Sequence, residues 1–168
     1  AELRPGDSLW LSGTPNGFLV LDEIPEARDL WLLATGTGIG PFLSILKTEA
    51  PWQRFEKVVL GHSVQYAREL AYRETIDALR AAHGAQLEFV PLVTRETVPG
   101  ALPRRITASI ESGDLEQRTG LRLSPERSHV MLCGNSAMIT DVSAVLAGRG
   151  MQRHRRREPG HITTEKYH

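Results

Sequence analysis

One glycine-rich segment of this sequence has the composition of an anion-binding loop. Residues 35–41 read Thr-Gly-Thr-Gly-Ile-Gly-Pro, and they join an apolar run at 30–34 to residues with helical spacing. Glycines let backbone N–H groups approach a phosphate closely, and the start of a helix favours negative charge. The spacing differs from the Gly-x-Gly-x-x-Gly of the common dinucleotide fingerprint. The residues alone leave two interpretations open, a phosphate site and a tight strand-to-helix turn.

A second polar segment ends another apolar run. Residues 133–136 read Cys-Gly-Asn-Ser, and Cys133 is the one cysteine of the chain. A disulfide within the chain is therefore excluded, which suits a reducing cytoplasm, the predicted location. The usual role of a lone cysteine is that of a small buried apolar residue. Ser136 is a good N-cap, so we expect it to cap the helix that follows.

Basic side chains gather near the end of the chain. They are Arg153, Arg155, Arg156 and Arg157. Two interpretations are equally good: a basic face that steers an acidic protein partner, and an exposed edge strand whose charges block aggregation. Nucleic acid is a weaker candidate because no aromatic residues interleave the arginines. The six histidines lack the spacing of a local metal site, so no metal is predicted.

The length and composition limit the scaffold that positions these residues. The chain has 168 residues, 40% of them hydrophobic, with 20 basic against 20 acidic side chains. That length suits one well-buried domain, and the balanced charge gives no sign of a nucleic-acid or membrane partner. No apolar run approaches the length of a membrane span.

Four short, continuous apolar runs predict a buried parallel sheet. They lie at 30–34, 57–61, 87–93 and 129–134. Continuous runs are typical of strands that are covered on both faces. Helical spacing follows each run, beginning at Pro41 as a first helical position, with Tyr72 on the second stripe, Ile106 on the third and Met138 on the fourth. Strands that alternate with helices predict an α/β fold with a doubly wound parallel sheet.

Residues 1–27 do not follow this alternation. Two β-like runs, 8–11 and 18–21, stand among turn residues and predict antiparallel strands. Two strands do not form a stable sheet alone. We therefore expect 1–27 to be the end of a larger unit, separate from the alternation of strands and helices that follows it.

The order of these motifs resembles that of bacterial ferredoxin/flavodoxin–NADP⁺ reductases. Segment 33–44 (Leu-Ala-Thr-Gly-Thr-Gly-Ile-Gly-Pro-Phe-Leu-Ser) is similar to the family's pyrophosphate loop. Segments 62–72, 94–96 (Thr-Arg-Glu), 129–135 (His-Val-Met-Leu-Cys-Gly-Asn) and 155–161 (Arg-Arg-Arg-Glu-Pro-Gly-His) continue the likeness. Segments 3–7 and 17–22 are similar to the last strands of the family's FAD-binding barrel. The resemblance covers essentially the whole chain. It implies that 1–27 is the C-terminal remnant of the FAD-binding β-barrel with its linker, and that 28–168 is the NADP-binding domain.

The resemblance implies a flavoenzyme. In this family hydride passes between NADPH and FAD, and electrons pass singly to ferredoxin or flavodoxin. It implies two catalytic positions at the contact between nicotinamide and flavin, Thr37 and Cys133. The implied nucleotide-binding residues of the two loops are Thr35, Gly36, Thr37, Gly38, Gly40, Pro41, Gly134 and Asn135. Tyr167 and His168 match the family's tail, which folds back towards the flavin, and His168 stands where one subgroup has Trp.

The resemblance also implies a site for the 2′-phosphate of NADP. Arg95 and Arg105 match two family positions with this role, and a guanidinium suits a phosphate because it donates two parallel hydrogen bonds. The third position, usually Arg, is Gln65 here. Arg68 could compensate for the missing charge, although a solvated surface position is the better interpretation of Arg68.

The family's Arg-x-Tyr-Ser/Thr strand and diphosphate segment for FAD do not occur in this sequence. We therefore expect FAD to belong to a longer protein and this chain alone to be inactive. Two alternatives stay open, a stand-alone, non-catalytic NADP-binding module and the reductase component of an oxygenase system.

Overall fold

The molecule is built on a five-stranded, fully parallel sheet. The computed structural model describes residues 4–8, 10, 13, 17 and 19–167. The strands are β1 (Asp29–Thr35), β2 (Lys57–Val64), β3 (Leu87–Val93), β4 (Ser128–Asn135) and β5 (Ile162–Tyr167). Their spatial order is β3-β2-β1-β4-β5, and each neighbouring pair is parallel. The chain thus adds β2 and β3 on one side of β1, and it then returns to add β4 and β5 on the other side of β1.

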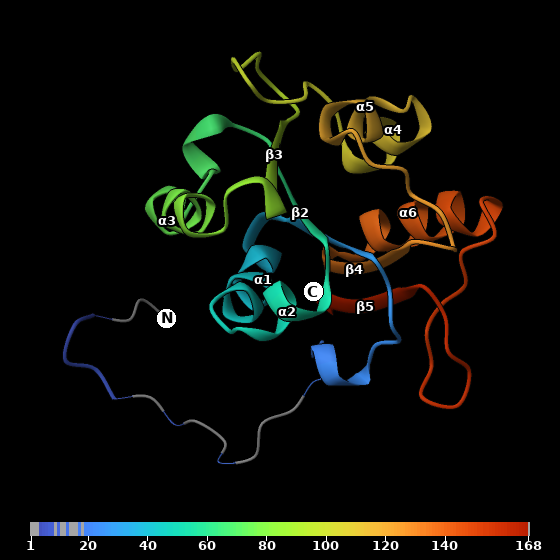
Figure 1. The fold of residues 1–168 in the computed structure, drawn as a ribbon. Helices are drawn as coiled ribbons and strands as arrows, with labels where there is room; N and C mark the ends of the chain where they lie inside the picture. Colours follow the sequence, from blue (N-terminus) through green and yellow to red (C-terminus); the bar gives the residue numbers. More distant parts are fainter. Residues whose placement is uncertain (1–3, 9, 11–12, 14–16, 18, 168) are drawn as a thin grey trace.

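Helices cover both faces of this sheet (Figure 1). The α-helices are α1 (Ile39–Leu46), α2 (Ala50–Arg54), α3 (Arg73–His83), α4 (Ile106–Glu111), α5 (Asp114–Thr119) and α6 (Ser136–Gly148). Among the described residues, 3-10 helices lie at Leu21–Glu23 (η1), Gly36–Gly38 (η2), Ala67–Glu69 (η3) and Gly84–Gln86 (η4). The predicted doubly wound parallel sheet is confirmed.

Alternate residues of the central strand serve two separate cores. Leu30, Leu32 and Ala34 of β1 pack with buried residues of α1 and α3. Trp31 and Leu33 face the other way and pack with buried residues of α4, α5 and α6. Because both faces of β1 are buried, its sequence reads as one apolar run.

Two details of the predicted helices were wrong. Helix α1 begins at Ile39, two residues before Pro41, because Gly36–Gly38 already turns as a 3-10 helix. Tyr72 precedes α3 in a left-handed conformation (φ 62°) and is 56% exposed, so it does not belong to the apolar stripe of Ile76.

The segment before β1 packs on the parallel-sheet domain. Leu19, Leu21 and Ile24 are buried in the core on the α1 face. Arg54 of α2 donates hydrogen bonds to the carbonyl oxygens of Leu21 (2.6 Å) and Ile24 (3.1 Å). The predicted antiparallel strands 8–11 and 18–21 lie partly outside the described residues. The described residues of these two runs are in no strand, and Leu21 begins η1.

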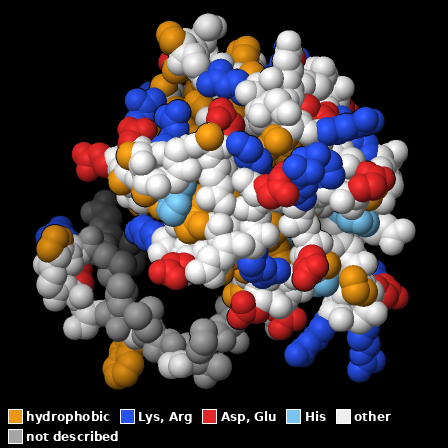
Figure 2. Space-filling model, viewed as in Figure 1, with side chains coloured by type: hydrophobic (Ala, Val, Ile, Leu, Met, Phe, Trp, Pro, Cys, Tyr) orange, Lys and Arg blue, Asp and Glu red, His pale blue; other side chains and the backbone are white. Residues whose placement is uncertain are grey.

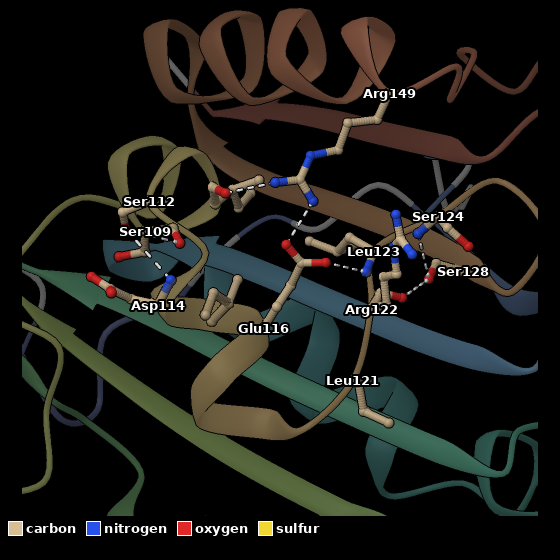
Figure 3. A network of polar contacts seen from close by, with 12 residues as sticks. Ser109, Ser112, Asp114, Glu116, Leu121, Arg122, Leu123, Ser124, Ser128 and Arg149 are labelled. Atoms are coloured by element: carbon tan, nitrogen blue, oxygen red, sulfur yellow. Dashed lines mark hydrogen bonds and ion pairs between the residues drawn. The ribbon is translucent and has the colours of Figure 1, made fainter.

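A polar network ties α4 and α5 to the end of α6 (Figure 3). The Arg149 guanidinium donates to the Glu116 carboxylate (2.8 Å) and to the Ile110 carbonyl oxygen (2.7 Å). Glu116 also accepts the Leu123 N–H at 2.8 Å. Arg149 therefore has a structural role, although it lies close in sequence to Arg153. In the part of the chain that the structure describes, no helix is both long and apolar enough to cross a membrane.

Candidate nucleotide-binding site

A cleft of about 660 Å³ opens at the carboxyl edge of the sheet, where β1 and β4 lie side by side. The chain reverses its direction of winding between these two strands, and ligands of such sheets bind at this point. Eight of the predicted site residues line the cleft, namely Thr35, Gly36, Thr37, Gln65, Arg95, Arg105, Gly134 and Asn135. They come from the ends of four strands and from the start of α4.

Two glycines bring the loops after β1 and β4 into contact. A Cβ on Gly38 would lie 2.5 Å from the carbonyl oxygen of Cys133. A Cβ on Gly134, which has φ +130°, would overlap the Thr35 hydroxyl and lie 2.8 Å from the Thr35 carbonyl oxygen. The Thr35 hydroxyl itself accepts the Asn135 N–H at 2.9 Å. The two loops therefore form one unit.

Other glycines of the loop leave the backbone open. Gly36 is exposed, has φ +52°, and has no atom within 4 Å of an added Cβ. The same open space surrounds Gly40 in the first turn of α1. Thr37 is exposed beside Gly36. Gly38, Gly40 and Pro41 follow these lining residues in the sequence, but they do not line the cleft themselves.

The loop after β4 caps the next helix through its asparagine. The Asn135 side-chain oxygen accepts the N–H groups of Ala137 (2.9 Å) and Met138 (3.3 Å). Asn135 is therefore the N-cap of α6, and Ser136 is its first helical residue. The prediction of Ser136 as N-cap was wrong by one residue.

A buried histidine forms a hydrogen bond with the glycine loop, and the sequence analysis did not predict this role. The His62 Nε2 atom donates to the carbonyl oxygen of Gly36 at 2.9 Å, because a carbonyl can only accept. Burial lowers the pKa of His62, and its hydrogen bond to Gly36 opposes that shift. The ring is thus neutral with its proton on Nε2. The sequence held two signals for His62, its position near the end of a strand and its place at the start of segment 62–72, which shares the family likeness.

Cys133 is fully buried, and its side chain belongs to the core that contains Ala34 and Ile39. Its backbone carbonyl is the group that meets Gly38. The thiol does not line the cleft. The predicted catalytic roles of Thr37 and Cys133 stay predictions.

Three predicted phosphate ligands lie in one part of the cleft. Gln65, Arg95 and Arg105 are exposed and line it together. No acidic group among the described residues pairs with the Arg95 or Arg105 side chain, whereas the neighbouring Arg104 is paired with Asp114 at 2.9 Å. Two guanidinium groups without an ion-pair partner suit an anionic ligand in this part of the cleft, although the Glu69 and Asp141 carboxylates also line the cleft.

Arg68 lies apart from these residues. Its guanidinium stacks over the Tyr66 ring, 4.7 Å from the centroid, and does not line the cleft. The structure thus gives no support to Arg68 as a substitute for the missing arginine at Gln65.

The remaining predicted residues belong to the last part of the sequence. The backbone of Tyr167 pairs with that of Asn135 in the sheet, while His168 lies outside the described residues. The exposed Arg153, Arg155, Arg156 and Arg157 occupy the segment between α6 and β5, and Figure 2 shows basic side chains projecting from the lower edge of the molecule, where this segment lies in Figure 1.

Comparisons with known proteins agree with this geometry. Residues 32–144 match the oxidoreductase NAD-binding domain family. The chain is 46% identical to the flavodoxin/ferredoxin–NADP reductase of Escherichia coli strain K12 over 168 residues, which cover 99% of this chain and 68% of that protein. The chain therefore spans about two thirds of this relative's length.

Solved structures give the same result. The ferredoxin–NADP⁺ reductase of Neisseria gonorrhoeae, solved with bound FAD and NADP, superposes with a TM-score of 0.84 at 38% identity, over 90% of this chain and 61% of that one. A cytochrome P450 reductase from Amycolatopsis superposes with a TM-score of 0.68 over 91% of this chain and 42% of that one, but at 24% identity it shows the shared fold alone. The identity to the bacterial reductases, over almost the whole chain, shows that this protein belongs to the flavodoxin/ferredoxin–NADP reductase family.

Proposed function

We propose that this chain binds NADP(H) and serves as the nicotinamide-nucleotide portion of a flavodoxin/ferredoxin–NADP reductase. The observation that carries this proposal is the pair of unpaired guanidinium groups, Arg95 and Arg105, in the same cleft as an open glycine loop. The relatives' names give the class of reaction, an NADP reductase of flavodoxin or ferredoxin, and one solved relative holds FAD and NADP. In the proposed reaction, hydride passes between NADPH and FAD, and single electrons pass to ferredoxin or flavodoxin.

The two ends of the cleft suit the two ends of the nucleotide. The exposed backbone of Gly36 and Thr37, at the N-terminal end of α1, suits the pyrophosphate because N–H groups and the helix dipole favour an anion. Gln65, Arg95 and Arg105 suit the 2′-phosphate. Thr37, Cys133 and the Gly134–Asn135 backbone then lie on the nicotinamide side.

FAD, when bound, supplies the hydride acceptor and the one-electron steps of the reaction. The residues of this chain supply nucleotide binding and orientation, with Tyr167 and His168 as the proposed tail residues nearest to the flavin. The domain division at 27/28 and a cytoplasmic location remain part of this proposal.

We further propose that the segment with Arg153, Arg155, Arg156 and Arg157 docks the acidic electron-transfer partner. Arg155 pairs with Glu158 at 3.2 Å and Arg156 with Glu23 at 3.7 Å. Exposed pairs of this kind contribute little energy. Both guanidinium groups therefore stay available to steer an acidic surface.

Calorimetric titration with NADP⁺ and NAD⁺ tests the nucleotide proposal. The wild-type chain is expected to bind NADP⁺ more tightly, with a preference that weakens as salt rises. Arg95→Ala and Arg105→Ala are each expected to lower NADP⁺ affinity by about one to two powers of ten and to leave NAD⁺ affinity almost unchanged.

Arg104→Ala is the matched control, because Arg104 is adjacent to Arg105 but pairs with Asp114. Its effect on NADP⁺ affinity should be small. Equal losses for NADP⁺ and NAD⁺ in Arg95→Ala or Arg105→Ala would show that these arginines support the fold, and the proposed site would be wrong.

A further inference from the structure

Two carboxylates fasten the turn after β2 to itself and to the turn after β3. Glu69 accepts the N–H groups of Gln65 (2.9 Å) and Tyr66 (3.2 Å). Glu96, from the loop after β3, accepts the N–H of Ala67. We refer to Glu69 and Glu96, with these three amides, as the carboxylate clasp.

The clasp continues the ladder between β2 and β3 beyond the strands. Val64 accepts the N–H of Thr94 (3.1 Å) and the Thr94 hydroxyl (3.3 Å), and Gln65 accepts the N–H of Arg95 (3.0 Å). Gln65 and Arg95 are therefore joined through their backbones. Both of these residues line the cleft.

A small hydrophobic cluster supports the clasp, separate from the two main cores. Val64, Leu70 and Val93 are buried together, with Val98 and Ala101 packed against them. Few apolar contacts hold this region, so its polar contacts have a larger share in fixing the turns.

The charge of the clasp opposes phosphate binding. Glu69 lines the cleft together with Arg95 and Arg105, and a carboxylate near a phosphate weakens its binding by repulsion. Repulsion does not explain why carboxylates occupy these positions. Their hydrogen bonds to backbone N–H groups do explain it. Hydrogen bonds to an ionised acceptor are also stronger than neutral ones.

We propose that Glu69 and Glu96 are positioning residues for nucleotide specificity: the carboxylate clasp holds the turns of Gln65 and Arg95 so that both side chains contact the same phosphate group. This inference rests on the proposed function for the identity of that phosphate. If repulsion were the only effect of these carboxylates, removing either one would strengthen binding of the phosphate. If they position Gln65 and Arg95, removing either one weakens it.

The experiment compares Glu96→Ala, Glu96→Gln, Glu69→Ala and Glu69→Gln with wild type in titrations with NADP⁺ and NAD⁺. Each alanine variant is expected to weaken NADP⁺ binding by about fivefold, the effect of one net hydrogen bond. The glutamine variants keep an acceptor oxygen and lose the charge, so they are expected to retain wild-type NADP⁺ affinity or exceed it. NAD⁺ affinity should not change in any of them.

Glu74→Ala is the matched control, since Glu74 is an exposed carboxylate of α3 with no hydrogen-bonded partner among the described residues. It should leave NADP⁺ affinity unchanged. In the double variant Glu96→Ala/Arg95→Ala, the loss should be smaller than the sum of the two single losses, because part of the effect of the clasp acts through Arg95.

A second measurement needs no nucleotide. Hydrogen exchange of the Gln65 and Ala67 amides should be faster in Glu69→Ala and Glu96→Ala, respectively, than in wild type. Unchanged exchange, or tighter NADP⁺ binding by the alanine variants, would overturn the inference. If Arg95→Ala still weakens NADP⁺ selectively in that case, the proposed function stands; if Arg95→Ala has no selective effect, the proposed function itself fails.

Discussion

At the scale of single residues, the glycines of one loop have different roles. Gly38 allows close packing, since an added Cβ would meet the backbone of Cys133 at 2.5 Å. Gly36 and Gly40 have open space around the missing side chain, which leaves room for a ligand near the backbone. The pattern Gly-x-Gly-x-Gly therefore combines a packing requirement with a binding requirement, which explains why spacing alone could not separate a turn from a phosphate site.

A pair of substitutions separates these roles. Gly38→Ala should lower the free energy of unfolding by about 2 kcal/mol or more, because neither backbone can move away easily. Gly40→Ala should keep or slightly raise stability, since alanine favours a helix by about 1 kcal/mol over glycine, yet it should weaken nucleotide binding. Urea unfolding and calorimetric titration measure the two effects. Equal stability of both variants would contradict the assignment of Gly38.

The Gln65 position offers a gain of function. Gln65→Arg adds a third cation to the part of the cleft that holds Arg95 and Arg105, so NADP⁺ affinity should rise by about tenfold while NAD⁺ affinity stays constant. Arg68→Ala should change neither, because Arg68 stacks over Tyr66. Competitive titration with the two nucleotides provides the measurement. A parallel rise for NAD⁺ would mean that Gln65 does not lie at the 2′-phosphate.

At the scale of elements, the strands that are buried on both faces are those that the sequence predicts well. The strands β1 to β4 are apolar on both faces, and all four were predicted within three residues of their ends. The strand β5 was not predicted, because Ile162 is followed by four polar residues, 163–166, as is usual at a sheet edge. His62 and the carboxylate clasp were missed for a related reason. Their contacts join segments that lie far apart in the chain, or they involve backbone amides, which the sequence does not distinguish.

The network around Arg149 provides a test at this scale. Arg149→Ala removes the ion pair with Glu116 and the hydrogen bond to Ile110, and it leaves a partly buried carboxylate without its partner. The free energy of unfolding should fall by about 1–2 kcal/mol. The exposed Arg157→Ala serves as control, and nucleotide affinity should be unchanged in both. Urea denaturation decides the outcome, and a loss no greater than that of Arg157→Ala would show that the network contributes little.

At the scale of the whole molecule, two buried histidines make stability depend on pH. His62 and His129 are each 1% exposed, one near the end of β2 and the other near the start of β4. Burial lowers the pKa of His129 to about 3, with smaller contributions from His154, His161 and Arg54. Its Nε2 atom lies 2.9 Å from the Thr163 hydroxyl, which joins β4 to the edge strand β5.

The direction of the pH effect follows from these lowered values. In the unfolded chain a histidine binds a proton below about pH 6.5, whereas folded His129 stays neutral down to its lowered pKa. The unfolded state therefore gains protons first, and stability falls as the pH drops below about 6.5. For His129 alone, the loss between pH 8 and pH 5 should be about 2 kcal/mol, and His62 adds to it in the same direction.

Urea unfolding at a series of pH values from 8 to 5 measures this dependence. His129→Phe removes the titrating group, so the slope of the unfolding free energy against pH should decrease even if the variant is less stable at pH 8. His83→Phe is the matched control, because His83 lies at the end of α3, where its ring stacks on Trp52 at a centroid distance of 3.6 Å, and it should leave most of the slope in place. If the His129→Phe slope equals that of wild type, His129 binds its proton over the same pH range in the folded and unfolded states, and its burial does not control the acid stability of the sheet.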